Sequence, residues 1–136
     1  MELTAKTLHS ISNEVPFGTN LNVEICKMFS LMDAKRGVGL AANQVGMTAR
    51  VIVVDVKGFR SAIINPVITR KSGKKKVSVE GCLSFPSKNV KVMRDEAVTV
   101  SGFDHLWNPV KKNCRGLLAF CIQHEIDHLD GVTIVK

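Results

Sequence analysis

The segment Gln123-His124-Glu125-Ile126-Asp127-His128, near the end of the chain, carries two histidines four residues apart. The apolar spacing around it predicts a helix from about residue 116 to residue 130, with Gly131 as the residue that ends it. Since each helical residue turns by about 100°, His124 and His128 lie on one side of this helix. Two histidines at this spacing, with a carboxylate between them, are typical of a divalent metal site that has its own acid or base.

A projection of this helix places both histidines on its apolar side, where neutral imidazoles without a partner are costly and a metal would satisfy them. Glu125 falls in the same apolar arc, so we expect burial to favour its protonated form, although an adjacent dication would act in the opposite sense. Asp127 lies at the margin of the polar side and is predicted to be a surface group or a hydrogen-bond partner of the site. Other residues are predicted to share the apolar side (Leu117, Phe120 and Cys121) or the opposite side (Ala119, Gln123 and Asp130).

The third metal ligand is predicted to come from upstream, because only eight residues follow His128 and the one donor among them, Asp130, faces away. This argues against an ordinary zinc peptidase, whose third ligand lies downstream. Cys82 stands in a glycine-containing turn and would give a site of two histidines and one thiolate with an open fourth position. The alternative is a closed structural zinc site in which Cys114 and Cys121 join the two histidines.

The rest of the chain predicts a single α+β domain over residues 1–136, with antiparallel β-sheets packed around the C-terminal helix and an N-terminal helix outside. That first helix is expected from about Asn20, with Thr19 or Asn20 as its cap and Gly37 just beyond its end. Strands are predicted at 50–56, 62–64, 67–68, 77–79, 90–92 and 98–100. The basic run 70–76 is predicted to be the tip of a hairpin, and 102–113 a loop or a hairpin.

Composition indicates an ordinary soluble globular protein: 45% of residues are hydrophobic and 23% charged. No apolar run reaches the ~18 residues of a membrane span, and the N-terminus lacks the apolar core of a secretion signal. We therefore expect a cytoplasmic location, with the four cysteines present as thiols. The net charge of +7 favours weak attraction to acidic surfaces. Specific nucleic-acid readout is not expected, because aromatic residues make up only 5% and tyrosine is absent.

Three segments in order closely resemble the signature motifs of peptide deformylases: Gly37-Val38-Gly39-Leu40-Ala41-Ala42-Asn43-Gln44, Glu80-Gly81-Cys82-Leu83-Ser84, and the histidine segment 123–128. The resemblance covers roughly residues 20–135. It implies that Cys82, His124 and His128 bind one divalent metal ion, Fe(II) in the cell, with zinc, nickel or cobalt possible in a purified sample.

The resemblance also implies the roles of the remaining site residues. Glu125 would be the general base and acid, and Gln44 with the backbone N–H of Leu83 would hold the developing oxyanion. The backbone of Gly39 would help to hold the substrate. The pocket for the methionine side chain would be lined by Val38, Leu117, Phe120 and Cys121.

The reaction implied by the resemblance is removal of the N-formyl group from the N-terminal methionine of newly synthesised polypeptides. A metal-bound hydroxide would attack the formyl carbon, and formate would be released. The open alternatives are hydrolysis of another small amide by the same site, and a zinc-stabilised binding module that contacts ribosomal RNA through its basic surface.

Three features depart from the usual family pattern: Asn43 stands where many members have proline or another residue, Ser87 stands where glycine is common, and the sequence stops at Lys136. The first is expected to alter only loop rigidity, and the second the rim of the site. Typical bacterial members continue into a further helix associated with ribosome docking, so only weak ribosome association is expected. The protein is expected to be a monomer. The compact form resembles the short versions encoded by bacteriophages, which would act in the cytoplasm of the bacterial host.

Overall fold

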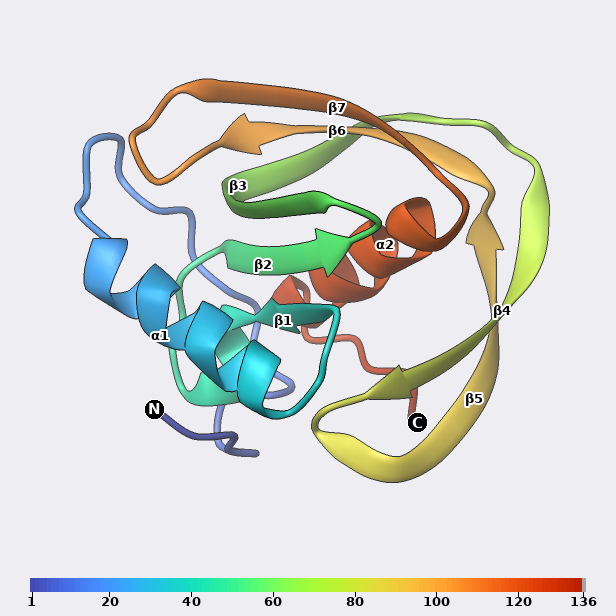
Figure 1. The fold of residues 1–136 in the computed structure, drawn as a ribbon, viewed down its shortest axis with the longest axis horizontal. Helices are drawn as coiled ribbons and strands as arrows, with labels where there is room; N and C mark the ends of the chain where they lie inside the picture. The colour runs from blue at the N-terminus through green and yellow to red at the C-terminus, as the bar shows by residue number, and fades with distance from the viewer. Residues whose placement is uncertain (136) are drawn as a thin grey trace.

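The computed structural model describes residues 1–135 and contains two helices, one short 3₁₀ helix and seven strands. In chain order these are α1 (Asn22–Ala34), β1 (Gly39–Ala41), η1 (Ala42–Val45), β2 (Val51–Val56), β3 (Phe59–Lys71), β4 (Lys75–Cys82), β5 (Phe85–Asp95), β6 (Ala97–Phe103), β7 (Pro109–Arg115) and α2 (Gly116–Leu129). Every strand pair is antiparallel: one sheet has the order β1-β2-β3-β6-β7, and β4 pairs with β5 (Figure 1). The predicted α+β class is confirmed.

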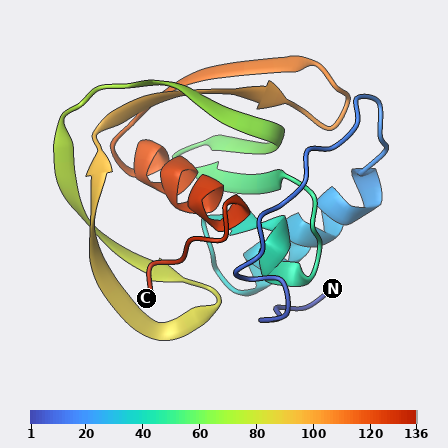
Figure 2. The same cartoon turned by 180° about the vertical axis from the view of Figure 1, so that it is seen from behind.

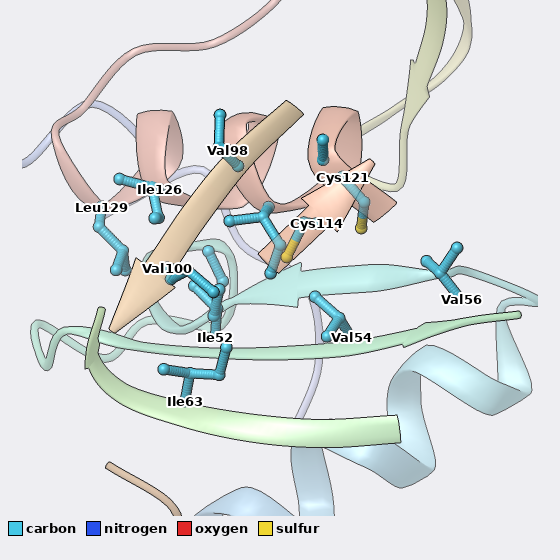
Figure 3. Packing of buried hydrophobic residues seen from close by; sticks show 13 residues of the cluster. Ile52, Val54, Val56, Ile63, Val98, Val100, Cys114, Cys121, Ile126 and Leu129 are labelled. Atoms are coloured by element: carbon cyan, nitrogen blue, oxygen red, sulfur yellow. The ribbon is translucent and has the colours of Figure 1, made fainter. Parts of the chain in front are cut away.

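The central sheet separates the two helices. Ile52, Val54 and Val56 of β2 pack with α2, whereas Val51 and Val53, which point to the opposite face, pack with α1. Because β2 is buried on both faces, it appears in the sequence as a continuous apolar run instead of an alternating one. Figure 3 shows the α2 side of this core, where Ile126 and Leu129 of the helix face the valines and isoleucines of the sheet.

Residues 64–103 form one long antiparallel hairpin that runs through both sheets. Its outer part is β4 paired with β5, its inner part is β3 paired with β6, and backbone bonds from Ser72 to Ala97 and from Glu96 to Lys74 continue the ladder between them. The tip lies between Cys82 and Phe85, which are paired. The prediction of a hairpin tip at 70–76 is therefore wrong: this basic run carries the strand from one sheet into the other, and the chain reverses at residues 83 and 84.

The outer part of the hairpin curves around α2, so that this helix lies between the central sheet and the β4–β5 ribbon (Figure 2). Contact on both sides explains why α2 has almost no polar face. Gln123 and Ala119, which were predicted on the polar side, are both buried, and the Gln123 amide is bonded to the backbone N–H and C=O of Asp95. Leu117, predicted on the apolar side, is 49% exposed because it borders an open cavity.

Both helices end in the same pair of backbone hydrogen bonds. After α2, Gly131 N–H donates to His128 C=O and Val132 N–H donates to Asp127 C=O, with Gly131 in the left-handed region at φ +77°, as predicted for the residue that ends this helix. After α1 the left-handed position is occupied by Arg36, at φ +57°, and Gly37 follows it. At the start of α1 the predicted cap, Thr19 or Asn20, is wrong: Leu21 occupies that position and forms no side-chain capping hydrogen bond, although the Asn20 side chain accepts one from Asn22 N–H at 3.0 Å.

The segments predicted to be irregular are partly ordered. Residues 102–113 are the end of β6, a short turn and most of β7, so the hairpin alternative is the correct one. No helix among residues 1–135 has the length and apolar character needed to cross a membrane.

Candidate metal centre and active site

Cys82, His124 and His128 converge on one point. One potential ligand atom from each lies within 4.8 Å of the others; the Cys82 Sγ is 3.3 Å from the His128 Nε2, and the two Nε2 atoms are 3.2 Å apart. The two histidines stand one helical turn apart on α2, and Cys82 is brought to them by the tip of the long hairpin. The structure thus brings together the three predicted ligands. Cys82 and His128 are 46 residues apart in the sequence.

A buried charge network holds His124 from behind. Its Nδ1 donates to Glu80 at 2.9 Å, and the same carboxylate accepts two hydrogen bonds from Arg94, at 3.0 and 2.8 Å. Arg94 also bonds Asp127, which confirms the prediction of a hydrogen-bond role for that residue. Burial alone would raise the pKa of Glu80, but hydrogen bonds from His124, Arg94 and Ser78 lower it to about 2. With Nδ1 committed to Glu80, the Nε2 of His124 points into the site.

Glu80 and Arg94 were not predicted as site residues, although the strand pattern contains a signal for both. Ser78 and Glu80 are the buried alternating positions of β4, and Cys82 follows two residues later, after a shift in the register with β5. Val90, Val92 and Arg94 alternate in the same way on β5. When a charged residue falls among the side chains that point toward the protein interior, it is a buried charge and needs a partner. Glu80 and Arg94 both fall at such positions.

Glu125 lies beside the ligands and is 5% exposed. Burial raises its pKa to about 7, as expected from its place in the apolar arc. Its Oε1 has no hydrogen-bond partner within residues 1–135. A Cβ built on Gly39 would lie 2.5 Å from the Glu125 Oε2 and 2.8 Å from the Cys121 Sγ, so only glycine allows β1 to approach this carboxylate so closely.

Gln44 is held in one orientation at the edge of the site. Its Oε1 accepts a hydrogen bond from Ala41 N–H at 2.9 Å, so its Nε2 donates toward the site, to the Ser84 Oγ at 2.9 Å and the Cys82 Sγ at 3.5 Å. Leu83 follows Cys82 at the hairpin tip and packs on Gly37, where an added Cβ would lie 2.8 Å from its Cδ1.

Asn43, next to Gln44, is fully buried and makes hydrogen bonds that the sequence did not predict. Its Nδ2 donates to the backbone carbonyl of His128, with longer contacts to the carbonyls of Leu8 and Ser10 at 3.4 and 3.5 Å. Its role is therefore not limited to loop rigidity: it ties the N-terminal segment and the 3₁₀ helix to the last turn of α2.

An open cavity of about 430 Å³ leads to these groups. All of the substrate-contacting residues that the motifs implied line it: Val38, Gly39, Leu117, Phe120 and Cys121. Gln44, Cys82, Leu83, His124 and Glu125 line it as well. Cys121 is buried there with its thiol directed at the Val38 carbonyl at 3.5 Å, and burial raises its pKa well above the ordinary value.

The residues fit a divalent cation. A thiol and two imidazole nitrogens converge, which is the donor chemistry of zinc and iron sites. Burial lowers the pKa of His128 to about 3, so this ring is neutral and has a lone pair to offer. Burial would also lower the pKa of His124, but Glu125, Cys82 and Glu80 raise it to about 10, and the surroundings that favour a proton there equally favour a metal cation. The closed zinc site with Cys114 and Cys121 is not formed among the described residues, since the converging thiol is that of Cys82.

A Cys-His-His donor set with a buried carboxylate beside it, at the end of an open cavity, defines a metal-binding hydrolase. The family model described as polypeptide deformylase matches residues 1–136. The chain belongs to this family and is a deformylase enzyme.

Similar proteins include peptide deformylase 1 of Corynebacterium glutamicum, which is 46% identical over 126 residues, or 90% of this chain and 75% of that protein. The crystal structure of PDF from the Vibrio parahaemolyticus bacteriophage VP16T in complex with actinonin matches with a TM-score of 0.96 and 45% identity, over 98% of this chain and 100% of that chain. A probable peptide deformylase from synechococcus phage S-SSM7 matches with a TM-score of 0.89 and 39% identity, over 98% of each chain.

Proposed function

We propose that this enzyme removes the formyl group from the N-terminal methionine of newly synthesised polypeptides, with a divalent metal ion bound by Cys82, His124 and His128. The observation that carries the proposal is the meeting of these three donors beside the unpartnered carboxylate oxygen of Glu125. A divalent ion bound there would lower the pKa of water and polarise the formyl oxygen. The net reaction joins water to the formyl carbon and breaks the C–N bond, which yields formate and a free methionine amine.

Glu125 moves the proton in this proposal. It accepts a proton from the attacking water through its carboxylate and delivers it to the methionine nitrogen as the C–N bond breaks. A pKa of about 7, raised by burial, suits a group that must both take and return a proton near neutral pH.

Gln44 and Leu83 stabilise the negative charge that develops on the formyl oxygen. The Ala41 N–H fixes the Gln44 amide so that its Nε2 donates toward the site, and the backbone N–H of Leu83 is the second donor. Donors fixed in advance need not reorganise as charge develops, which is the usual source of their catalytic effect.

The methionine side chain is bound in the cavity by Val38, Leu117, Phe120 and Cys121, and the Gly39 backbone holds the peptide. Val38 and Leu117 are 47% and 49% exposed, so an apolar side chain in the cavity would cover them. Fe(II) is the proposed native ion, with zinc, nickel or cobalt as substitutes. We further propose a cytoplasmic monomer that associates weakly with ribosomes.

The proposal is tested by measuring formate release from a formyl-Met tripeptide with protein purified without air and loaded with iron, nickel or cobalt. Release from the formyl peptide and not from the matching acetyl peptide supports the function, and no release with any of the three metals refutes it. Cys82→Ala should lose the metal. Glu125→Ala should keep the metal and lose turnover, which separates metal binding from chemistry.

A further inference from the structure

Lys35 and Arg36 give the cavity a basic mouth. Both are exposed and line it, and neither forms an ion pair with any residue from 1 to 135. The carboxylates among the described lining residues are Glu80 and Glu125, which are 8% and 5% exposed; Glu80 is already paired with Arg94 and His124. The outer part of the cavity therefore carries positive charge without an accessible carboxylate to neutralise it.

The backbone of Arg36 is unusual for a residue with a side chain. Arg36 N–H donates to Asp33 C=O at 3.0 Å and Gly37 N–H donates to Met32 C=O at 2.9 Å, which is the helix ending that places one residue in the left-handed region. Glycine is preferred at that position because it has no Cβ. The same chain uses Gly131 there after α2 but Arg36 after α1, at φ +57°.

Gly37, the next residue, does not occupy the left-handed position itself. Gly37 is not among the glycines with positive φ; its lack of a side chain leaves room for Leu83, whose Cδ1 would lie 2.8 Å from an added Cβ. An arginine is thus held in a strained conformation, at the mouth of a site, where glycine would be more stable. Residues kept under strain in this way cluster where the side chain has a use.

We infer that Arg36, with Lys35, binds a carboxylate of the peptide substrate downstream of its methionine, so that the enzyme prefers formyl peptides with an acidic residue at the second or third position. This inference rests on the proposed deformylase function and adds a substrate class to it. Arg36 is suited to the role because a guanidinium can donate two parallel hydrogen bonds to one carboxylate. The hydrogen-bonded turn between α1 and β1 holds the backbone of Lys35 and Arg36 at the mouth of the cavity.

The test compares kcat/KM for three amidated peptides: formyl-Met-Gln-Gln, formyl-Met-Glu-Gln and formyl-Met-Gln-Glu. A fourth peptide, formyl-Met-Gln-Gln with a free C-terminal carboxylate, separates a side-chain carboxylate from a chain end. For an exposed ion pair we expect an advantage of about 3- to 5-fold for at least one of the Glu peptides at low salt. The advantage should lie in KM with kcat unchanged, and it should shrink in about 0.5 M NaCl.

Arg36→Gly is the decisive variant. It should raise Tm by about 2–4 °C, because glycine relieves the left-handed residue, and it should abolish most of the preference for Glu peptides while hydrolysis of the Gln peptide stays unchanged. Lys57→Gly is the matched control: Lys57 is also exposed with a positive φ of 48°, and it does not line the cavity. This control removes the same charge and the same backbone strain and should leave the preference intact.

The outcomes separate the two proposals. Equal kcat/KM for Gln and Glu peptides, or a preference that survives in Arg36→Gly, overturns the role of Arg36 and leaves the deformylase function standing. A preference that both glycine variants lose equally reflects overall charge and also overturns it. Failure to hydrolyse any of the formyl peptides overturns the proposed function, and the substrate preference with it.

Discussion

Replacing Glu80 with glutamine tests whether the buried charge network holds the structure together. Glu80→Gln keeps the shape of the side chain and removes its charge, which leaves the Arg94 guanidinium, 7% exposed, with Asp127 alone. Removing one partner of a buried ion pair typically costs about 3–5 kcal/mol, because the other charge stays buried without compensation.

The pKa of Glu80 gives a second measure of the same cost. A fall from the ordinary 4.5 to about 2, at about 1.4 kcal/mol per pH unit, corresponds to about 3 kcal/mol of stabilisation of the carboxylate in the folded state. Because the folded pKa is lowered, this contribution is fully present above pH 4.5 and is lost as the pH falls through 2. For a domain of this size, 3 kcal/mol corresponds to a fall in Tm of about 10 °C.

The assay is thermal unfolding of wild type and Glu80→Gln, followed by circular dichroism between pH 3 and pH 7, with metal content measured on the same samples. The stability difference should be largest at pH 5–7 and should narrow toward pH 3. Metal affinity should fall by about 10- to 100-fold, because Glu80 orients the His124 ring. A fall in Tm of less than about 3 °C at pH 7 would refute the reasoning.

Two controls separate the buried pair from its exposed neighbour. Asp127→Asn removes a carboxylate whose side chain is 42% exposed, so it should cost less than about 1 kcal/mol. Glu80→Gln combined with Arg94→Met removes both buried charges and should recover most of the stability that the single variant loses.

Four further predictions concern the residues around the predicted ligands. Glu125→Gln should lower kcat by about 10²- to 10⁴-fold with metal content unchanged, and an active variant would rule out the proton role. Burial raises the Glu125 pKa to about 7, so its protonated form contributes stability that is complete below pH 4.5 and is lost as the pH rises through 7. With metal removed by a chelator, the Tm of the wild type should therefore fall between pH 4.5 and pH 7 by more than the Tm of Glu125→Gln. Gly39→Ala should lower kcat/KM by more than about 10-fold and the free energy of unfolding by about 1–3 kcal/mol, because the new Cβ would meet the Glu125 Oε2 and the Cys121 Sγ. Kinetics equal to those of the wild type would contradict this prediction. Asn43→Ala should cost about 0.5–1.5 kcal/mol, because the His128 carbonyl loses the buried Asn43 donor and keeps the hydrogen bond from Gly131 N–H; unchanged urea unfolding would count against the buried contact.

The sequence predicted well what depends on local periodicity. The bounds of both helices, the strand at 51–56 and the shared side of His124 and His128 all follow from spacing along one element. The identity of the third ligand does not, because Cys82 approaches from a turn 46 residues away. Periodicity left a site with Cys114 and Cys121 as an alternative; Cys82 was favoured by its place in a glycine-containing turn, and the resemblance to a family implied the same residue.

The errors have one physical cause: periodicity within a segment says nothing about which segments pair. The run 70–76 has the glycine and the charges of an exposed turn, yet Ser72 and Lys74 are bonded to the opposite strand, and the chain reverses only after Cys82. For the same reason α2 was expected to have a polar face at Gln123. The β4–β5 ribbon covers that face, and the Gln123 amide takes up the backbone groups of Asp95.

The long hairpin would also determine when a metal ion in the proposed site becomes hard to exchange. His124 and His128 would be able to bind an ion together as soon as α2 is helical, but an ion held by only two protein ligands would dissociate readily. Cys82 would join them only after the hairpin from 64 to 103 has closed, and closing such a loop carries an entropic cost that local helix formation does not. The rate at which a radioactive metal isotope exchanges with free ion during refolding would therefore act as a clock for closure of the hairpin on the helix.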